Sequence, residues 1–237
     1  MFTWGPQESG SFDPLWANVS LLLKFDDQAD ESTTITDSSS HADHKTATTG
    51  IDIDTGRSKF GAGSLRIVRQ QPEGIIWSGT RFNRTTGNAI TVEGWSRKET
   101  ALASTATPMI FRLAGLTIAD QVMQLTKYQT GNKVQVRFGV GDTATEHTYT
   151  PDGDGWFYWM MKIDAANVGE LWLGTTLAKT FSGAPGSTGV ANFALGGISA
   201  GAATAIDFNV DNLRVTQADR YPSGITSIPT DFPIGGS

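Results

Sequence analysis

The chain has 237 residues, no cysteine, and 18 Lys and Arg against 24 Asp and Glu, which gives a formal net charge of −6. The absence of cysteine excludes disulfides, thiolate metal sites and cysteine nucleophiles. The acidic balance, without a basic run, argues against a nucleic-acid partner, and no apolar stretch has the length of a membrane-spanning helix.

Strand patterns follow one another along most of the chain. Gly is frequent at 27 residues, and Ser, Thr, Asn and Asp separate short apolar runs, which is typical of many strands joined by turns. The clearest alternation, at 133–140, predicts a hairpin with 121–127. The predicted strands cover residues 19–25, 51–54, 64–68, 74–77, 89–97, 121–127, 133–140, 157–163, 170–173, 176–181, 191–195 and 205–216. They predict an all-β fold, a two-sheet antiparallel β-sandwich.

Both ends of the chain differ from this pattern. Residues 1–14 are polar and predict an extended N-terminal arm before a domain at 15–220, and residues 221–237 predict an extended tail because prolines interrupt ladder pairing. The alternative for the arm is a frayed terminus. Phe2, Trp4 and Phe12 are costly to leave in water, so we expect the arm to bind a partner.

Four segments occur in a fixed order: VSLLLKFD at 19–26, SKFGAGSL at 58–65, ITVEGW at 90–95 and VDNLRV at 210–215. Their order resembles the concanavalin A-like (laminin-G-like) jelly-roll family, in particular the copies in bacteriophage virion proteins. The resemblance implies a lectin- or glucanase-like jelly roll. It says less about function, because the fold hosts lectins, hydrolases and structural modules.

The resemblance implies a bacteriophage structural protein that decorates the capsid exterior in the virion. In this interpretation a homo-oligomer, most simply a trimer, cements neighbouring copies of the major capsid protein. The alternative is a glycan-binding adhesion module, on a tail fibre or on the capsid, that attaches the virion to host or environmental polysaccharide.

Aromatic residues are the candidates for glycan binding. Sugar rings stack on exposed aromatic faces, and Trp77, Tyr158, Trp159 and Trp172 are placed in strands where they could serve. The alternative is packing, because large aromatic residues of a sandwich lie mostly in its core.

Three aspartates form a candidate structural calcium site. Asp211 shares a strand face with apolar residues, and Asp26 and Asp27 end the first strand, so Asp26 or Asp27, Asp211 and backbone carbonyls would hold the ion if the first and last strands are neighbours. The alternative is that backbone amides or an arginine satisfy Asp211. The stretch at 152–155 (DGDG) reads as a turn. We expect no other cofactor.

No catalytic residues are predicted. Glycoside hydrolases need two carboxyl groups that flank the scissile bond, whereas Glu93 is alone on its strand. His41, His44 and His147 read as solvated side chains. The sequence therefore predicts a protein that is not an enzyme.

Overall fold

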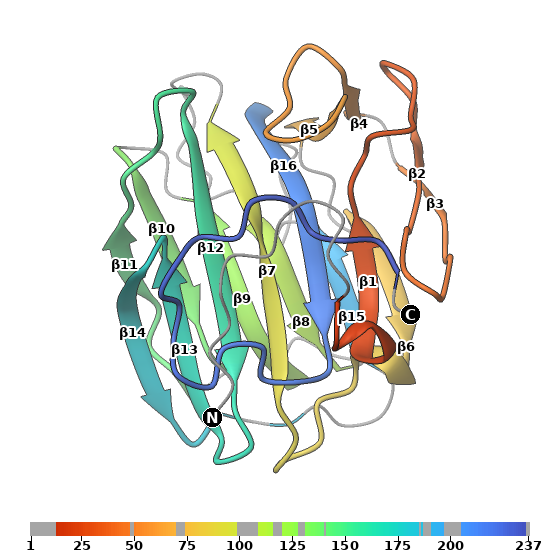
Figure 1. Cartoon of the computed structure of the whole chain (residues 1–237). Coiled ribbons are helices and arrows are strands. Elements are labelled where there is room, and N and C mark those ends of the chain that lie inside the picture. Colours follow the sequence, from red (N-terminus) through yellow and green to blue (C-terminus); the bar gives the residue numbers. More distant parts are fainter. Residues whose placement is uncertain are drawn as a thin grey trace.

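The computed structural model describes residues 13–47, 50–69, 74–98, 109–115, 120–127, 131–139, 141–184, 186, 191–196 and 205–235. These residues form two antiparallel sheets stacked face to face, with a small two-stranded ribbon beside them (Figure 1). The prediction of an all-β, two-sheet sandwich is confirmed.

The larger sheet has eight strands in the order β14-β13-β12-β7-β16-β5-β4, and β1 pairs with the second half of β16. Its strands are β1 (Val19–Leu23), β4 (Ile51–Asp54), β5 (Ser64–Arg69), β7 (Ile90–Lys98), β12 (Trp156–Ile163), β13 (Val168–Leu173), β14 (Thr176–Ser182) and β16 (Ala205–Thr216). The first and last strands are therefore neighbours.

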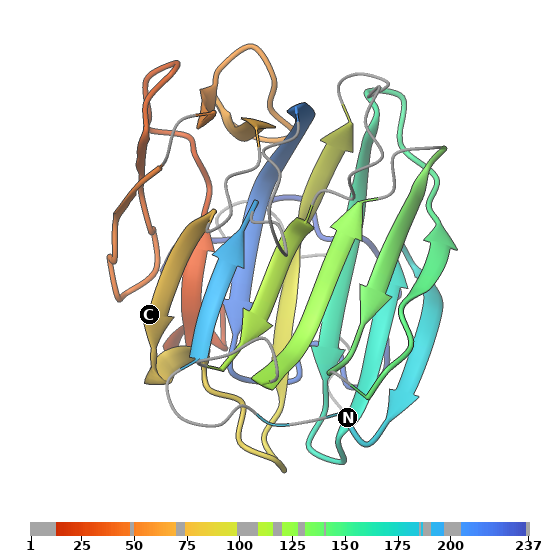
Figure 2. The ribbon, with the colours of Figure 1, turned by 180° about the vertical axis from the view of Figure 1, so that it is seen from behind.

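The smaller sheet has six strands in the order β11-β10-β9-β8-β15-β6, and Figure 2 shows it in front. Its strands are β6 (Ile75–Gly79), β8 (Met109–Ala114), β9 (Gln121–Lys127), β10 (Lys133–Arg137), β11 (Thr145–Thr148) and β15 (Ala191–Leu195). The ribbon joins β2 (Thr34–Ile35) to β3 (Lys45–Thr46).

The helices within the described ranges are two single turns, η1 (Trp16–Asn18) and η2 (Thr80–Phe82). No helix in the described part of the chain is long and apolar enough to cross a membrane.

The strands differ from the sequence prediction in a few places. Strand β8 was not predicted, because its run MIFRLA is almost continuously apolar and carries no period of two. Strand β11 was also missed, since its residues TEHT are all polar. Strand β10 ends at Arg137 and not at residue 140, and Gly139 just beyond it has a φ of 75°.

The main core lies between the two sheets. Stacked rings join its layers: the Phe111 ring lies 5.1 Å from that of Trp159, and 5.7 Å from that of Phe193. Trp77 and Trp159 are fully buried there. Burial of side chains this large contributes most of the favourable free energy of folding.

Glycines let the 58–65 loop approach the end of β1. A Cβ on Gly61, whose φ is 59°, would lie 1.6 Å from Oδ1 of Asp26, and a Cβ on Gly63 would lie 2.9 Å from the Phe25 carbonyl oxygen. Only glycine fits contacts this close. The loop is held there because Asp211 accepts hydrogen bonds from the backbone of Lys59 and Phe60.

The C-terminal segment (residues 217–235) crosses the outer face of the eight-stranded sheet, as the dark blue trace in front of β16, β7 and β12 shows (Figure 1). Its Ile225 and Phe232 pack into a second apolar cluster, which includes Trp95 and Tyr158 from the sheet. Lys24 donates to Asp231 at 2.7 Å and so fixes the far end of the segment. The central strands β7 and β12 are therefore buried on both faces.

A buried polar network lies under the same segment. Glu93 of β7 is fully buried and accepts hydrogen bonds from the hydroxyls of Tyr158 and Tyr221, at 2.6 and 2.7 Å. Arg214 donates to its other oxygen, and Arg220 lies 3.4 Å from it. Burial alone would raise the pKa of Glu93, but the two guanidiniums and the two hydroxyls lower it below its usual value.

Candidate functional site

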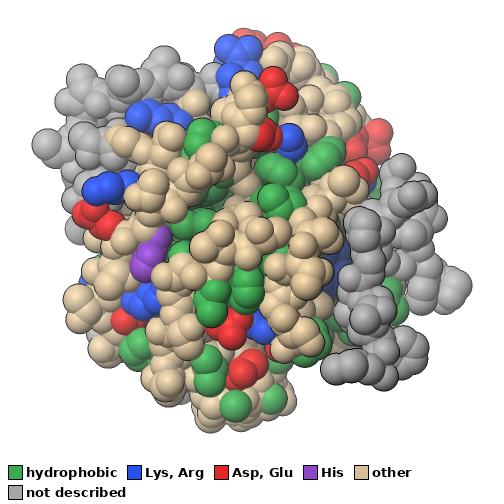
Figure 3. Space-filling view, turned by 60° about the vertical axis from the view of Figure 1, so that its left-hand side comes forward, with side chains coloured by type: hydrophobic (Ala, Val, Ile, Leu, Met, Phe, Trp, Pro, Cys, Tyr) green, Lys and Arg blue, Asp and Glu red, His purple; other side chains and the backbone are tan. Residues whose placement is uncertain are grey.

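An open hollow of about 370 Å³ lies where β7, β12, the β13–β14 hairpin and the C-terminal segment meet. Figure 3 views the molecule from this end, where hydrophobic side chains gather around a depression in a mostly polar surface. Its volume lies within the range of small-molecule sites, roughly 300–1,000 Å³. The hollow is lined by Trp95, Thr148, Tyr149, Thr150, Pro151, Asp152, Trp156, Phe157, Tyr158, Leu173, Gly174, Thr175, Thr176, Ala178 and Ile228.

The floor of the hollow is aromatic and apolar. Trp95 and Tyr158 meet edge to face with ring centroids 5.6 Å apart, and the rings of Tyr149 and Phe157 stack at 3.6 Å. All four residues are nearly fully buried, so their rings are fixed by packing. Burial raises the pKa of Tyr149 to about 12, so its hydroxyl stays protonated at neutral pH. The floor is a preformed apolar surface.

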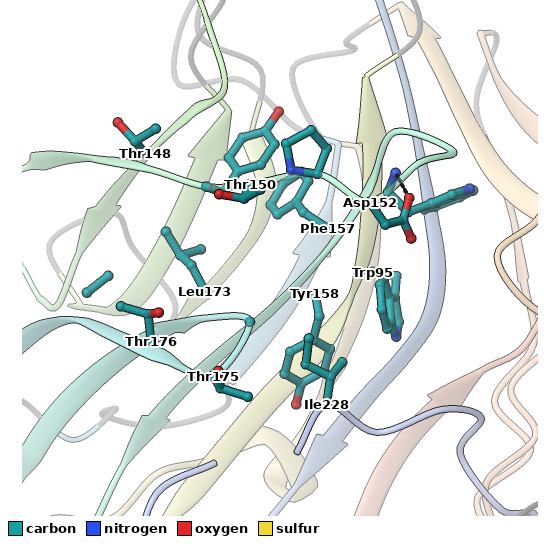
Figure 4. Close-up of a pocket in the computed structure, with 15 residues that line it drawn as sticks. Trp95, Thr148, Thr150, Asp152, Phe157, Tyr158, Leu173, Thr175, Thr176 and Ile228 are labelled. Atoms are coloured by element: carbon teal, nitrogen blue, oxygen red, sulfur yellow. Dashed lines mark hydrogen bonds between the residues drawn. The ribbon is translucent and has the colours of Figure 1, made fainter. Parts of the chain in front are cut away.

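The rim of the hollow is rich in hydroxyl groups. Thr148 and Thr150 lie on one side and Thr175 and Thr176 on the other, with Leu173 and Tyr158 between them (Figure 4). All four threonines are exposed. The β13–β14 turn is held in place by the Gly174 amide, which donates to the Tyr158 carbonyl at 3.0 Å.

A charged pair closes one corner of the hollow. Oδ1 of Asp152 accepts from the amides of Asp154 and Trp156, both at 3.0 Å, which confirms the predicted turn at 152–155. Its Oδ2 accepts from Lys59, whose ammonium also lies 4.6 Å from the centroid of Trp95. Burial would raise the pKa of Asp152, but Lys59 and the amides hold it below its usual value.

In the structure, most of the side chains predicted to bind glycans are buried. Trp77 and Trp159 are fully buried between the sheets, where their Nε1 atoms donate to the Asp43 carbonyl and to Ser96 Oγ. Tyr158 is buried in the floor, with its hydroxyl on Glu93. Trp77 and Trp159 do not line the hollow, because both pack in the core between the sheets; of the three residues, Tyr158 contributes to its floor.

Trp172 is the exception, since it is half-buried. Its Nε1 donates to Glu170 at 2.7 Å. A Cβ on Gly224 of the C-terminal segment would lie 2.6 Å from its ring, so that segment covers part of it. Trp172 therefore anchors the C-terminal segment instead of forming an open stacking platform.

The candidate calcium ligands lie near one another without forming a cage. Asp211 accepts from the amides of Lys59 and Phe60 through Oδ2 and of Asn212 through Oδ1, which is the alternative foreseen for it. Asp26 accepts from the Ala62 amide, and Asp27 is exposed. Among the described residues, no group of three or more His, Cys, Asp or Glu side chains could hold a metal ion.

Asp211 has an unusually high pKa for a carboxyl group. Burial raises its pKa to about 7, and the nearby charge of Asp26 adds to this, while the three backbone amides oppose it.

The candidate arm residues Phe2, Trp4 and Phe12 lie outside the described residues.

Sequence reasoning missed the hollow itself. Its rim comes from two turns at 148–152 and 173–176 and from Ile228 in the tail, and Lys59 of the glycine loop pairs with Asp152 there. The available signal was the threonine content of the two turns that flank the aromatic strand β12. Nothing local in the sequence indicates that these turns meet.

No family model matches the sequence, and no curated protein does either. Among solved structures, the chain is similar to the binding domain of Paraclostridial Mosquitocidal Protein 1, with a TM-score of 0.57 and 14% identity over 86% of this chain and 50% of that one. It is also similar to botulinum neurotoxin type C, whose cell entry is dependent upon interaction with two ganglioside molecules, with a TM-score of 0.57 and 10% identity over 86% and 49%.

A third similar structure is Trypanosoma rangeli sialidase in complex with sialic acid, with a TM-score of 0.59 and 11% identity over 85% of this chain and 31% of that one. The chain thus spans about half the length of the first two chains and about a third of the sialidase chain. At these identities the likeness establishes the fold, a β-sandwich of the lectin-like type, in agreement with the jelly-roll resemblance.

Proposed function

We propose that the protein is a glycan-binding module and that the hollow between the 148–152 loop and the β13–β14 turn is its binding site. The observation that carries the proposal is the pairing of an apolar, preformed floor with a rim of exposed threonine hydroxyls. A sugar ring has the matching chemistry, with apolar C–H faces and a hydroxyl edge.

The charged corner adds polar specificity. Asp152 and Lys59 supply an acceptor and a donor that are already oriented, Asp152 by its turn and Lys59 by its position over Trp95. A polar pair that is fixed before binding loses little entropy when a ligand hydroxyl joins it. The similar toxin structure whose cell entry depends on gangliosides, and the sialidase seen with sialic acid, are consistent with a sugar ligand on this fold.

The proposed activity is binding and not cleavage. Glycoside hydrolysis uses two carboxyl groups, one on each side of the scissile bond. Asp152 is the one acidic residue among those that line the hollow, and Lys59 pairs with it. This arrangement suits a ligand that is held and released unchanged.

The capsid-decoration role suggested by the sequence stays a prediction. It rests on the arm residues Phe2, Trp4 and Phe12, which lie outside the described residues, and on the resemblance to virion proteins. The trimeric state, the major-capsid partner and the location in a virion stay predictions with it. A glycan-binding role is compatible with a position on a virion surface.

The test is a glycan array with the wild-type protein and two variants. Thr176→Arg places a long cation across the hollow from an exposed position, whereas Thr85→Arg makes the same change at an exposed threonine that does not line it. We expect Thr176→Arg to lose binding and Thr85→Arg to keep it. Failure of the wild type to bind any glycan, or equal binding by both variants, would overturn the proposal.

A further inference from the structure

The outer face of the six-stranded sheet is nearly free of acidic residues. Of the 24 Asp and Glu residues in the chain, Glu146 is the one that falls within the six strands of this sheet. The strands of the eight-stranded sheet hold six: Asp52, Asp54, Glu93, Glu170, Asp207 and Asp211. The six strands hold four basic residues, Arg112, Lys127, Lys133 and Arg137, so they are net positive in a chain of net charge −6.

Two arginines and a glutamine form a row across this face. Arg112 of β8 pairs in register with Gln124 of β9, and Gln124 pairs in register with Arg137 of β10. Each lies between two buried core residues on its strand, so the alternation of the pleat directs all three side chains to the outer face. Because neighbouring strands are about 4.8 Å apart, the two arginines start roughly 10 Å from each other.

Neither arginine has an ion-pair or hydrogen-bond partner among the described residues. Lys133, another basic residue of β10, is different, since it pairs with Glu146 at 3.2 Å. Both arginines are half-buried, and burial lowers the pKa of Arg112 below its usual value. A partly desolvated guanidinium without a carboxylate is unfavourable in the free protein, and an anionic ligand would relieve that cost.

We propose that the row Arg112–Gln124–Arg137 is a second binding site, separate from the hollow, that takes a polysaccharide bearing carboxylate groups. Each planar guanidinium matches a carboxylate through two parallel hydrogen bonds. The amide of Gln124 between them suits a sugar hydroxyl. The separation of the arginines is about the length of a disaccharide, so that carboxylates on alternate sugars would reach both.

The surrounding residues favour a polysaccharide over an acidic protein segment. The outward positions next to the row are polar or small: Gln135 and Asn192 are partly exposed, and Ala194 pairs in register with Arg112. Gln124 itself donates to the buried Thr126 at 3.0 Å. The exposed large hydrophobic residues of the described chain, Leu177, Ile228 and Ile234, all lie outside this sheet. A protein partner would need an apolar centre, which this face does not offer.

The test measures binding of the full chain to immobilised polygalacturonate, to its methyl ester and to poly-glutamate. The double variant R112Q/R137Q removes both cations of the row, and R57Q/K133Q removes the same net charge from exposed or already paired positions. We expect wild type and R57Q/K133Q to bind polygalacturonate and the ester to be bound weakly. R112Q/R137Q should bind polygalacturonate about tenfold or more weakly, since hydrogen bonds between charged groups are the stronger ones.

Several outcomes would overturn this proposal. They are absence of binding to polygalacturonate, equal binding of its methyl ester, equal loss in R57Q/K133Q, and stronger binding of poly-glutamate, which would indicate a protein partner. Thr176→Arg separates the two sites: it should leave polygalacturonate binding unchanged even if it abolishes glycan binding in the hollow. If R112Q/R137Q melts at a lower temperature than wild type, the single variant R137Q takes its place in the binding comparison. Loss of wild-type binding to polygalacturonate on addition of salt is the second measurement.

Discussion

Arg214 holds the buried carboxylate of Glu93 through two of its nitrogens, with Nε at 3.0 Å and Nη2 at 2.8 Å from Oε1. Both side chains lie on the outer face of the eight-stranded sheet, beneath the C-terminal segment. The segment adds Tyr221 and Arg220 to the same carboxylate. This pair therefore joins the sheet to the segment that carries Ile228 to the rim of the hollow.

Replacing Glu93 by Gln should destabilise the protein strongly. The change leaves Arg214 and Arg220 buried with less compensating charge, and breaking a buried pair typically costs about 3–5 kcal/mol of the free energy of unfolding. For a chain of this size we expect a melting temperature lower by roughly 10 °C in thermal unfolding. Glu146→Gln, which breaks an exposed pair with Lys133, is the control and should change it little.

Acid should weaken the same network. The pKa values of Glu93 and Asp13 lie below their ordinary values of 4.5 and 3.8, because Arg214 and Arg220 outweigh the opposing effect of burial. Their stabilising contribution is therefore present above about pH 5 and is lost as the pH falls through the folded-state pKa values. The melting temperature of wild type should fall between pH 6 and pH 3, and that of Glu93→Gln should fall less. An equal fall in both proteins would contradict this prediction.

Asp211 should produce the opposite dependence. Its pKa is raised to about 7, chiefly by burial, so its contribution to stability is fully present below about pH 4 and is lost as the pH rises through about 7. Asp211→Asn cannot ionise and keeps one carbonyl oxygen for the amides of Lys59 and Phe60. We expect the melting temperature of the variant to change less than that of wild type between pH 5 and pH 8. An identical slope in both proteins would refute this assignment.

Gly224→Ala should loosen the C-terminal segment. Gly224 has a φ of 81°, and an added Cβ would lie 2.6 Å from the ring of Trp172, so the variant combines backbone strain with a clash. The expected cost is about 1–3 kcal/mol, and limited proteolysis should cut the segment faster. The control is Gly153→Ala, where a Cβ would meet nothing within 4 Å.

The N-terminal arm should tolerate shortening only up to Asp13. Asp13 is fully buried and pairs with Arg220 at 2.9 Å and with Arg214 at 3.1 Å. Deleting residues 1–10 keeps this residue, whereas deleting 1–14 removes it and leaves two buried guanidiniums with one carboxylate fewer. We expect only the longer deletion to lower the melting temperature. Equal melting temperatures would show that Asp13 contributes little.

The local pattern of the sequence was enough to predict the strands that carry a period of two. The alternation in β10 and β7 depends on one residue and its next neighbours, because side chains of a strand point to opposite faces in turn. The glycine loop at 58–65 was recognisable through its resemblance to the jelly-roll family, and the structure supplies the physical reason, since Gly61 and Gly63 serve a close approach that no other residue permits. The order of such segments was sufficient to indicate a jelly roll.

The tertiary structure alone decided what covers each face. A strand pattern says which side chains share a face, but not whether a distant segment lies over it. Tyr158 and Glu93 share the outer face of their sheet, and they are buried only because residues 217–235 return across it. The hollow likewise joins Lys59, Asp152 and Ile228, which are far apart in the chain and meet because burial of apolar surface folds the two sheets and the tail into one body.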